Sequence, residues 1–170
     1  MSDTSLIPWD AEGHLDVLTF DLESETFALE ATQVQEILDL LPETGVPGAH
    51  PLVGSVVNFR GKIIPLADLR LAFGMQAAEA TVDSRIVVIE MIIEDEPLQI
   101  GIRADSVHEV ATLDRSASEV APAVGMRWRR DYVRGLIRRP EGVIVLPDLT
   151  TIFASTLGGA GVPSLAATTH

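Results

Sequence analysis

Two aspartates, Asp68 and Asp148, have the placement that most resembles a catalytic pair. Each follows a short apolar run and precedes a leucine. Two carboxylates that share a proton catalyse hydrolysis in aspartic proteases, so a duplicated small-barrel hydrolase that uses this pair is one hypothesis. Alternatively, each carboxylate caps a helix and accepts backbone N–H bonds, worth about 0.5–2 kcal/mol. Capping is favoured, because neither aspartate lies in the tight Gly-containing loop that the shared-proton arrangement requires.

Other reactive groups are sparse. The absence of cysteine excludes disulfides, thiol catalysis and cysteine-ligated metal sites. The four histidines (His14, His50, His108 and His170) have no partner at zinc-ligand spacing. The glycine-rich stretch 158–161 does not follow a strand, and a Gly-x-Ser-x-Gly nucleophile motif is missing. We therefore expect no enzymatic activity, no bound metal and no cofactor.

The charge of the chain limits its partners. The 25 acidic and 12 basic residues give a net charge of −13. Such an acidic chain is a poor ligand for the phosphate backbone or for an anionic membrane, so we expect neither nucleic-acid binding nor membrane insertion. Six arginines are concentrated between positions 127 and 139, and they form either a solvated surface or a face that docks on a partner. They are Arg127, Arg129, Arg130, Arg134, Arg138 and Arg139.

The elements that must position these residues are mostly strands. Runs rich in β-branched and aromatic residues predict strands over Leu15–Leu22, Phe27–Leu29, Arg85–Glu94 and Leu98–Ile102. Turn residues predict two further hairpins, one over Val53–Leu66 and one over Tyr132–Leu146. Helical signals are short: Ala31–Ile37, and two capped segments that begin at Asp68 and at Asp148.

An internal repeat organises the chain. Residues 28–37 match residues 101–110 at an offset of 73, and both hairpins end in an apolar strand followed by Asp-Leu. The repeat predicts an all-β fold of two pseudo-repeated, five-stranded small β-barrels (SH3-like) with short helices, whose halves pack together and share strands. The expected division is a first barrel over 15–78, a second over 79–155, and flexible tails over 1–14 and 156–170, with a linker over 75–84.

Several side chains have both a structural and a functional interpretation. Glu36 and Glu109 are expected to point to solvent beside buried Ile37 and Val110. Trp128 and Tyr132 lie next to arginines, and they either form cation–π pairs or anchor a partner.

The motif over Val53–Leu69 resembles the CheW-like chemotaxis adaptors, whose signature reads G-x-x-N-L-R-G-x-x-x-P-x-x-D-L. Further matches in the same order lie at Phe27–Leu29, Val34–Ile37, Gly101–Val110 and Tyr132–Gly135, so the resemblance covers about residues 15 to 154. It implies two five-stranded barrels with an apolar receptor-docking groove between them, next to the hairpin. It also implies a non-catalytic coupling role between chemoreceptors and a histidine kinase.

The resemblance implies a set of partner-binding residues in this sequence. Asn58, Arg60 and Gly61 are carried over as receptor-side residues, and Val34 and Ile37 as groove liners. Hairpin chemistry is the alternative for Asn58 and Arg60, because Asn tolerates turn conformations and Arg can bond carbonyls at a barrel mouth. Phe59 stands where the family has Leu, and Pro147 interrupts the second Leu-Asp pairing.

The leading hypothesis is a cytoplasmic adaptor that joins the signalling tip of membrane chemoreceptors to the regulatory domain of a chemotaxis kinase. A cytoplasmic location is expected because the N-terminus lacks the basic and apolar regions of a secretory signal. The resemblance implies that the chain reaches receptor arrays through protein contacts. The alternatives are a same-family scaffold of twitching motility or another chemosensory-like phosphorelay and, more remotely, the hydrolase that uses Asp68 and Asp148.

Overall fold

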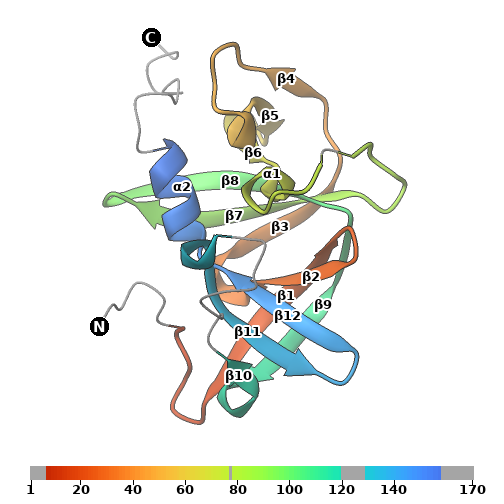
Figure 1. Ribbon diagram of the computed structural model, residues 1–170. Helices are drawn as coiled ribbons and strands as arrows, with labels where there is room; N and C mark the ends of the chain where they lie inside the picture. Colours follow the sequence, from red (N-terminus) through yellow and green to blue (C-terminus); the bar gives the residue numbers. More distant parts are fainter. Residues whose placement is uncertain (1–6, 77, 120–128, 158–170) are drawn as a thin grey trace.

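The computed structural model describes residues 7–76, 78–119 and 129–157, and its strands form two curled six-stranded sheets (Figure 1). Sheet A has the order β10-β11-β12-β2-β1-β9, and sheet B has the order β3-β7-β8-β6-β5-β4. The strands of sheet A are β1 (His14–Leu22), β2 (Glu25–Glu30), β9 (Ser106–Asp114), β10 (Ser118–Glu119), β11 (Val133–Arg139) and β12 (Gly142–Pro147). The strands of sheet B are β3 (Val34–Asp39), β4 (Glu43–Gly45), β5 (Ser55–Phe59), β6 (Lys62–Ala67), β7 (Arg85–Ile93) and β8 (Glu96–Ala104).

The predicted all-β class is confirmed. Each sheet has five strands of at least five residues, as expected, and a short edge strand, β10 or β4. The two expected hairpins are the antiparallel pairs β5–β6 and β11–β12. Short edge strands limit the unpaired backbone that each sheet presents to other chains.

The two sheets exchange strands. After β2 the chain leaves sheet A through a 3-10 turn, η1 (Ala31–Gln33), and enters sheet B as β3. In the second repeat it leaves sheet B after β8 and enters sheet A as β9. The expected sharing of strands is therefore confirmed. The proposed boundaries 15–78 and 79–155 describe repeats along the chain, whereas each sheet takes strands from both repeats.

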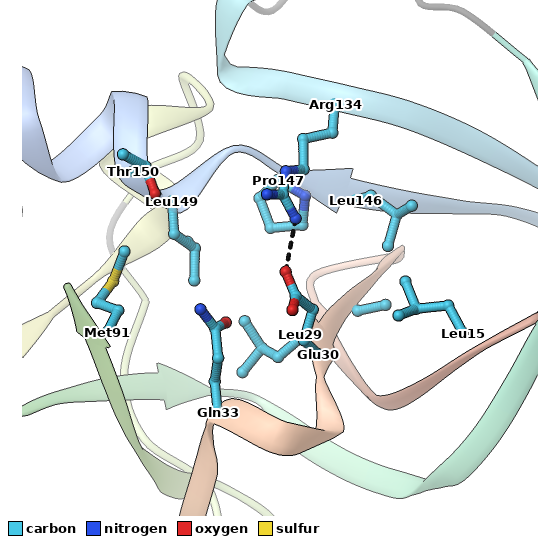
Figure 2. A pocket seen from close by; sticks show the side chains of 11 residues that line it. Leu15, Leu29, Glu30, Gln33, Met91, Arg134, Leu146, Pro147, Leu149 and Thr150 are labelled. Atoms are coloured by element: carbon cyan, nitrogen blue, oxygen red, sulfur yellow. Dashed lines mark hydrogen bonds and ion pairs between the residues drawn. The ribbon is translucent and has the colours of Figure 1, made fainter. Parts of the chain in front are cut away.

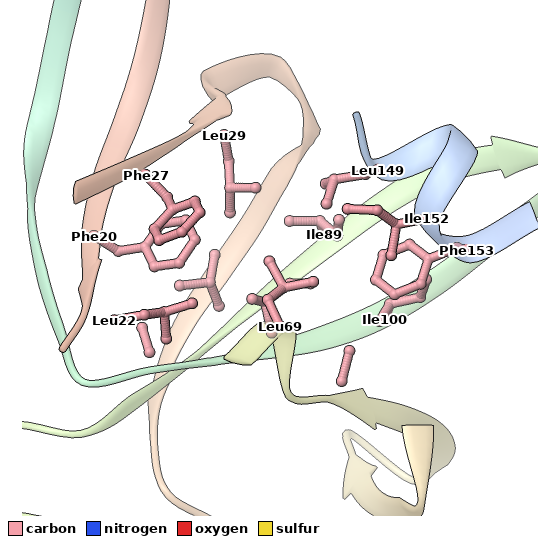
Figure 3. Packing of buried hydrophobic residues seen from close by; sticks show 14 of the residues in the cluster. Phe20, Leu22, Phe27, Leu29, Leu69, Ile89, Ile100, Leu149, Ile152 and Phe153 are labelled. Carbon is pink, nitrogen blue, oxygen red and sulfur yellow. The ribbon is translucent and has the colours of Figure 1, made fainter. Parts of the chain in front are cut away.

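One hydrophobic core lies between the sheets, and a smaller one lies inside each curled sheet. Successive side chains of a strand point to opposite faces, so β1 sends Phe20 to the core between the sheets and Val17 to the interior of sheet A. Figure 3 shows Phe20 and Phe27 on one side of the inter-sheet core and Ile152 and Phe153 on the other. Each fully buried side chain of this kind contributes about 1.5–3 kcal/mol, so the core holds the sheets together.

Two short helices follow the two hairpins. Asp68 precedes α1 (Leu69–Ala72), and its carboxylate accepts a hydrogen bond from the Arg70 N–H at 3.1 Å. Asp148 precedes α2 (Leu149–Leu157) and accepts one from the Thr151 N–H at 3.0 Å. The capping interpretation is confirmed for both aspartates. Because each carboxylate caps its own helix, neither is arranged as a partner for the other.

The segment Ala31–Ile37 differs from its helical expectation. Only Ala31–Gln33 form a 3-10 turn, and the rest belongs to β3, which pairs with β7. Pairing with a strand from the other repeat overrides the local preference. The tail expected over 1–14 contains a packed part, since Ile7 and Trp9 contact the interior core of sheet A. Residues 1–6 and 158–170 lie outside the described residues.

Three further 3-10 turns connect the strands. They are η2 (Pro51–Val53), η3 (Arg115–Ala117) and η4 (Arg130–Tyr132). Residues 75–84, expected to be a linker, carry neither helix nor strand where they are described, although Met75 at their start packs into the inter-sheet core.

Candidate functional site: the β5–β6 hairpin and the inter-sheet pocket

The turn between β5 and β6 brings together three of the five residues expected to bind a partner. Arg60 and Gly61 both have positive φ, at 55° and 82°, the combination that a two-residue hairpin turn requires. The side-chain oxygen of Asn58 accepts a hydrogen bond from the Gly61 N–H at 2.9 Å. Asn58 and Gly61 therefore build the turn that presents the Arg60 side chain.

The Arg60 guanidinium pairs with the Glu36 carboxylate on β3. It also lies 5.2 Å from the centre of the Phe59 ring, within the range of a cation–π contact. The Arg60 side chain is 70% exposed, so the ion pair itself contributes about 0–1 kcal/mol. Its main effect is to fix the hairpin tip against β3 and leave a guanidinium at the surface.

The expectations for β3 and β9 are met at the two glutamates and wrong at their apolar neighbours. Glu36 is partly exposed at the surface, where it pairs with Arg60, and Glu109 is exposed. Ile37 and Val110 were expected to be buried, yet they are 44% and 61% exposed. Adjacent side chains of a strand face opposite ways, so with Glu36 directed at the hairpin Ile37 faces outward.

The two expected groove liners lie in different surroundings. Val34 packs against the inter-sheet core, whereas Ile37 is exposed on the outer side of β3. The Arg60–Glu36 ion pair links the hairpin to β3, the strand that carries both Val34 and Ile37. Exposed Ile63 on β6, directly opposite Asn58, adds a second apolar side chain to this end of sheet B.

A pocket lies between the sheets on the side of α2, as Figure 2 shows. Its lining combines apolar side chains with polar ones, among them an ion pair between Arg134 on β11 and Glu30 on β2 at 2.7 Å. The two side chains are 23% and 19% exposed, and the buried Nε of Arg134 has no hydrogen-bond partner. The lining residues are Leu15, Ala28, Leu29, Glu30, Gln33, Met91, Arg134, Leu146, Pro147, Leu149 and Thr150.

The family resemblance implied a groove between the barrels with Val34 and Ile37 among its liners. None of the five expected residues lines this pocket, although Gln33 immediately precedes Val34. Its walls come from β1, β2, η1, β7, β11, β12 and α2, which are scattered along the chain. The internal repeat was the one sequence signal that pointed to a lining residue, because Arg134 lies at the start of the second copy of the hairpin motif.

The arginine cluster is largely paired with nearby acids. Arg129 bonds Asp131 at 2.7 Å and lies 4.4 Å from the centre of the Tyr132 ring. The hydrogen bond from Arg129 holds the pKa of Asp131 below its ordinary value. Arg138 pairs with Glu119. These contacts support the solvated interpretation and confirm the cation–π pair of Tyr132; Arg127 and Trp128 lie outside the described residues.

The described histidines each have a local partner. His108 Nε2 is 2.8 Å from Asp21, and His14 Nε2 is 3.6 Å from Asp114. His50 Nδ1 accepts a hydrogen bond from the Leu52 N–H at 3.1 Å. Within the described part of the chain, no group of three His, Cys, Asp or Glu side chains is arranged to hold a metal. In the same residues, no helix has the length and apolar character that crossing a bilayer requires.

Comparison with known proteins gives a consistent result. A family model described as "CheW-like domain" matches residues 16–157. The chain is similar to the chemotaxis protein CheW of Rhizobium meliloti, with 27% identity over 143 residues that cover 84% of this chain and 90% of the relative. It is also similar to the CheW of Klebsiella aerogenes, with 28% identity and 81% of each chain covered. Among solved structures it resembles the scaffolding protein TtCheW from Thermoanaerobacter tengcongensis, with a TM-score of 0.72, 28% identity, and 82% and 87% of the two chains covered.

Proposed function

The chain belongs to the CheW-like domain family, and we propose that it couples chemoreceptors to a chemotaxis histidine kinase without catalysing a reaction. The observation that carries the proposal is the match of nearly the whole folded chain to this family, together with its likeness to a scaffolding protein of known structure. The arrangement of the two sheets supports it. Because the sheets exchange strands and share one core, surfaces on both belong to a single body that can be held between two partners.

We propose that the receptor side is the end of sheet B with Asn58, Arg60 and Gly61, together with Val34 and Ile37 on β3. An exposed guanidinium on a fixed turn, beside exposed apolar side chains, has the composition that interface hot spots favour. Asn58 and Gly61 contribute by shaping the turn. Protein contacts of this kind would place the chain at receptor arrays.

Titration calorimetry with two soluble partners tests the coupling role. One is a receptor signalling-tip fragment and the other is the regulatory domain of the kinase encoded nearest to this protein. The proposal expects saturable binding to both, and simultaneous binding in a ternary mixture. Binding to neither partner would contradict it.

Replacing Arg60 with Ala tests the receptor surface. We expect receptor affinity to fall about tenfold, which corresponds to about 1.4 kcal/mol, while the fold is retained. Lys62→Ala is the matched control, because it removes an exposed cation from the same hairpin. Equal receptor affinities for Arg60→Ala and the wild type would remove Arg60 from the proposed surface.

A further inference from the structure

The most deeply buried basic side chain among the described residues belongs to Arg70 on α1 and is 6% exposed. Its guanidinium bonds Glu23 at 3.1 Å and also bonds Asp105. The Asp105 carboxylate accepts a second hydrogen bond, from the Glu23 N–H at 2.7 Å, and the Asp105 N–H donates to the Asp21 carbonyl at 2.9 Å. We refer to Arg70, Glu23 and Asp105 as the clamp.

The clamp joins the two sheets. Arg70 lies on the helix that follows β6 of sheet B, and Glu23 lies in the turn between β1 and β2 of sheet A. Asp105 is the residue at which the chain crosses from β8 in sheet B to β9 in sheet A. The guanidinium is buried, whereas the Glu23 and Asp105 side chains are 46% and 36% exposed. Charge-assisted hydrogen bonds depend strongly on distance and direction, so the clamp holds the sheets relative to each other at this crossover.

The other crossover has threonines in place of Arg70 and Asp105. By the repeat, Thr32 in η1 corresponds to Asp105, and Thr150 on α2 corresponds to Arg70. Both threonines are exposed, and Thr150 lines the inter-sheet pocket together with Gln33. The pocket therefore lies at the crossover that lacks the Arg–Asp pair of the clamp. Apolar contacts such as those of Met91 are less directional and tolerate sliding.

We propose that the clamp is the fixed side of a hinge between the two sheets, and that the inter-sheet pocket is the side that opens. Arg70 is then a positioning residue: it sets the width of the pocket from the opposite crossover. The inference deepens the proposed function. It rests on that function in one respect: receptor binding is taken to select one width of the pocket. A domain hinge commonly depends on a few residues at the ends of elements, as here.

Spin-label distances test the hinge without any partner. The chain has no cysteine, so labels can be placed at Ile92→Cys in sheet B and Val110→Cys in sheet A, which are 58% and 61% exposed. In Arg70→Met we expect a broader distance distribution than in the otherwise identical labelled chain. Arg103→Met is the matched control, because its partner Glu43 lies in the same sheet and its loss should leave the distribution unchanged. A folded Arg70→Met chain with an unchanged distribution would overturn the inference.

A variant in which all three clamp residues are uncharged keeps the test decisive if Arg70→Met alone does not fold. Combining Arg70→Met with Glu23→Gln and Asp105→Asn leaves no unpaired carboxylate and retains an acceptor for the Glu23 backbone N–H. This chain should also show the broader distribution. If it is folded and its distribution is as narrow as that of the parent, the charges of the clamp do not fix the sheets.

A second clamp can be built at the open crossover. Thr32→Asp with Thr150→Arg places the missing pair at two exposed positions, and Thr32→Ala with Thr150→Ala is the control. We expect the double clamp to narrow the distance distribution and to weaken binding of the receptor tip by about fivefold or more, the lower range of measured couplings between sites. Unchanged distances would count against the hinge. If the parent chain binds no receptor tip at all, the proposed function fails, whereas the distance measurements still decide the hinge.

Discussion

The two repeated hairpins each close with a two-residue turn, but they differ in turn conformation and in the residue that precedes the turn. In sheet B, β5 ends at Phe59, which is 7% exposed and belongs to the interior core of that sheet. In sheet A, β11 ends at Arg139, whose side chain is 34% exposed and lies 3.7 Å from Glu141. A buried ring therefore closes one sheet, whereas a charged side chain stands at the same place in the other.

The difference changes the surface beside each tip. Next to Arg139, sheet A has a groove that reaches Ala111 and Ile144 near its interior core. In sheet B, Phe59 belongs to the core, and the adjacent Arg60 is tied to β3. The same module thus gives a hairpin tip that is packed against its own sheet in sheet B and a tip beside a groove in sheet A. The two copies therefore keep the same strands, and the residue before the turn determines whether a buried ring or a charged side chain stands at the tip.

The largest predicted difference between the tips concerns stability. Phe59→Ala should lower the free energy of unfolding by about 3–5 kcal/mol, because it leaves a cavity in the interior core of sheet B. Arg139→Ala should cost less than about 1 kcal/mol, since its ion pair is long and exposed. Urea denaturation of both variants measures the two values. Equal losses of stability would show that the two ends of the sheets are closed equally well.

A smaller difference is expected one residue earlier on each strand. Asn58→Ala should cost about 0.5–1.5 kcal/mol, because the Gly61 N–H loses its acceptor. Asn58→Asp keeps an oxygen in the same place and should recover most of that loss. Arg138→Ala is the counterpart in sheet A and should cost at most about 1 kcal/mol, since the Arg138–Glu119 pair is exposed. An undiminished stability of Asn58→Ala would show that the turn does not depend on this hydrogen bond.

Much of the fold could be predicted because its determinants are local. The hairpins follow from turn residues next to apolar strands, and both helix starts follow from an aspartate that bonds an N–H two or three residues ahead. The Asn58–Gly61 hydrogen bond is equally local. It also explains why the structural interpretation of Asn58, weighed from sequence, agrees with the contact that this residue makes.

The crossovers and the contacts between sheets could not be predicted in the same way. The short segment Ala31–Ile37 has a helix-like composition, and only its pairing with β7 of the other repeat makes most of it a strand. Arg70 reaches partners 47 and 35 residues away, and Arg134 reaches Glu30 across 104 residues. A spacing rule does not link such pairs, because the exchange of strands alone brings them together. The exposure of Ile37 was not predicted for the same reason. It follows from the Arg60–Glu36 pair, which directs Glu36 at the hairpin and leaves Ile37 on the opposite face of β3.

The smallest predicted difference lies at the ends of the edge strands, β9 of sheet A and β3 of sheet B. Asp114 ends β9, and its pKa is lowered, first by the hydrogen bond from the Ser116 backbone N–H and then by that from the Ser116 side chain. A carboxyl whose pKa is lower in the folded state stabilises the fold above its unfolded pKa, and this stabilisation is lost as the pH falls through the folded value. Asp114→Asn should therefore be less stable than the parent at neutral pH, and this difference in stability should close below about pH 4, near the ordinary pKa of Asp.

Urea midpoints of the variant and the parent at pH 7, 5 and 3 measure the difference in stability. Asp39→Asn at the end of β3 removes the same charge together with an exposed 3.6 Å ion pair to Arg85, which is worth about 0–1 kcal/mol, and so corrects for the change in net charge. A difference in stability for Asp114→Asn that persists at pH 3 would mean that its carboxylate stabilises this edge of sheet A by something other than its ionised form.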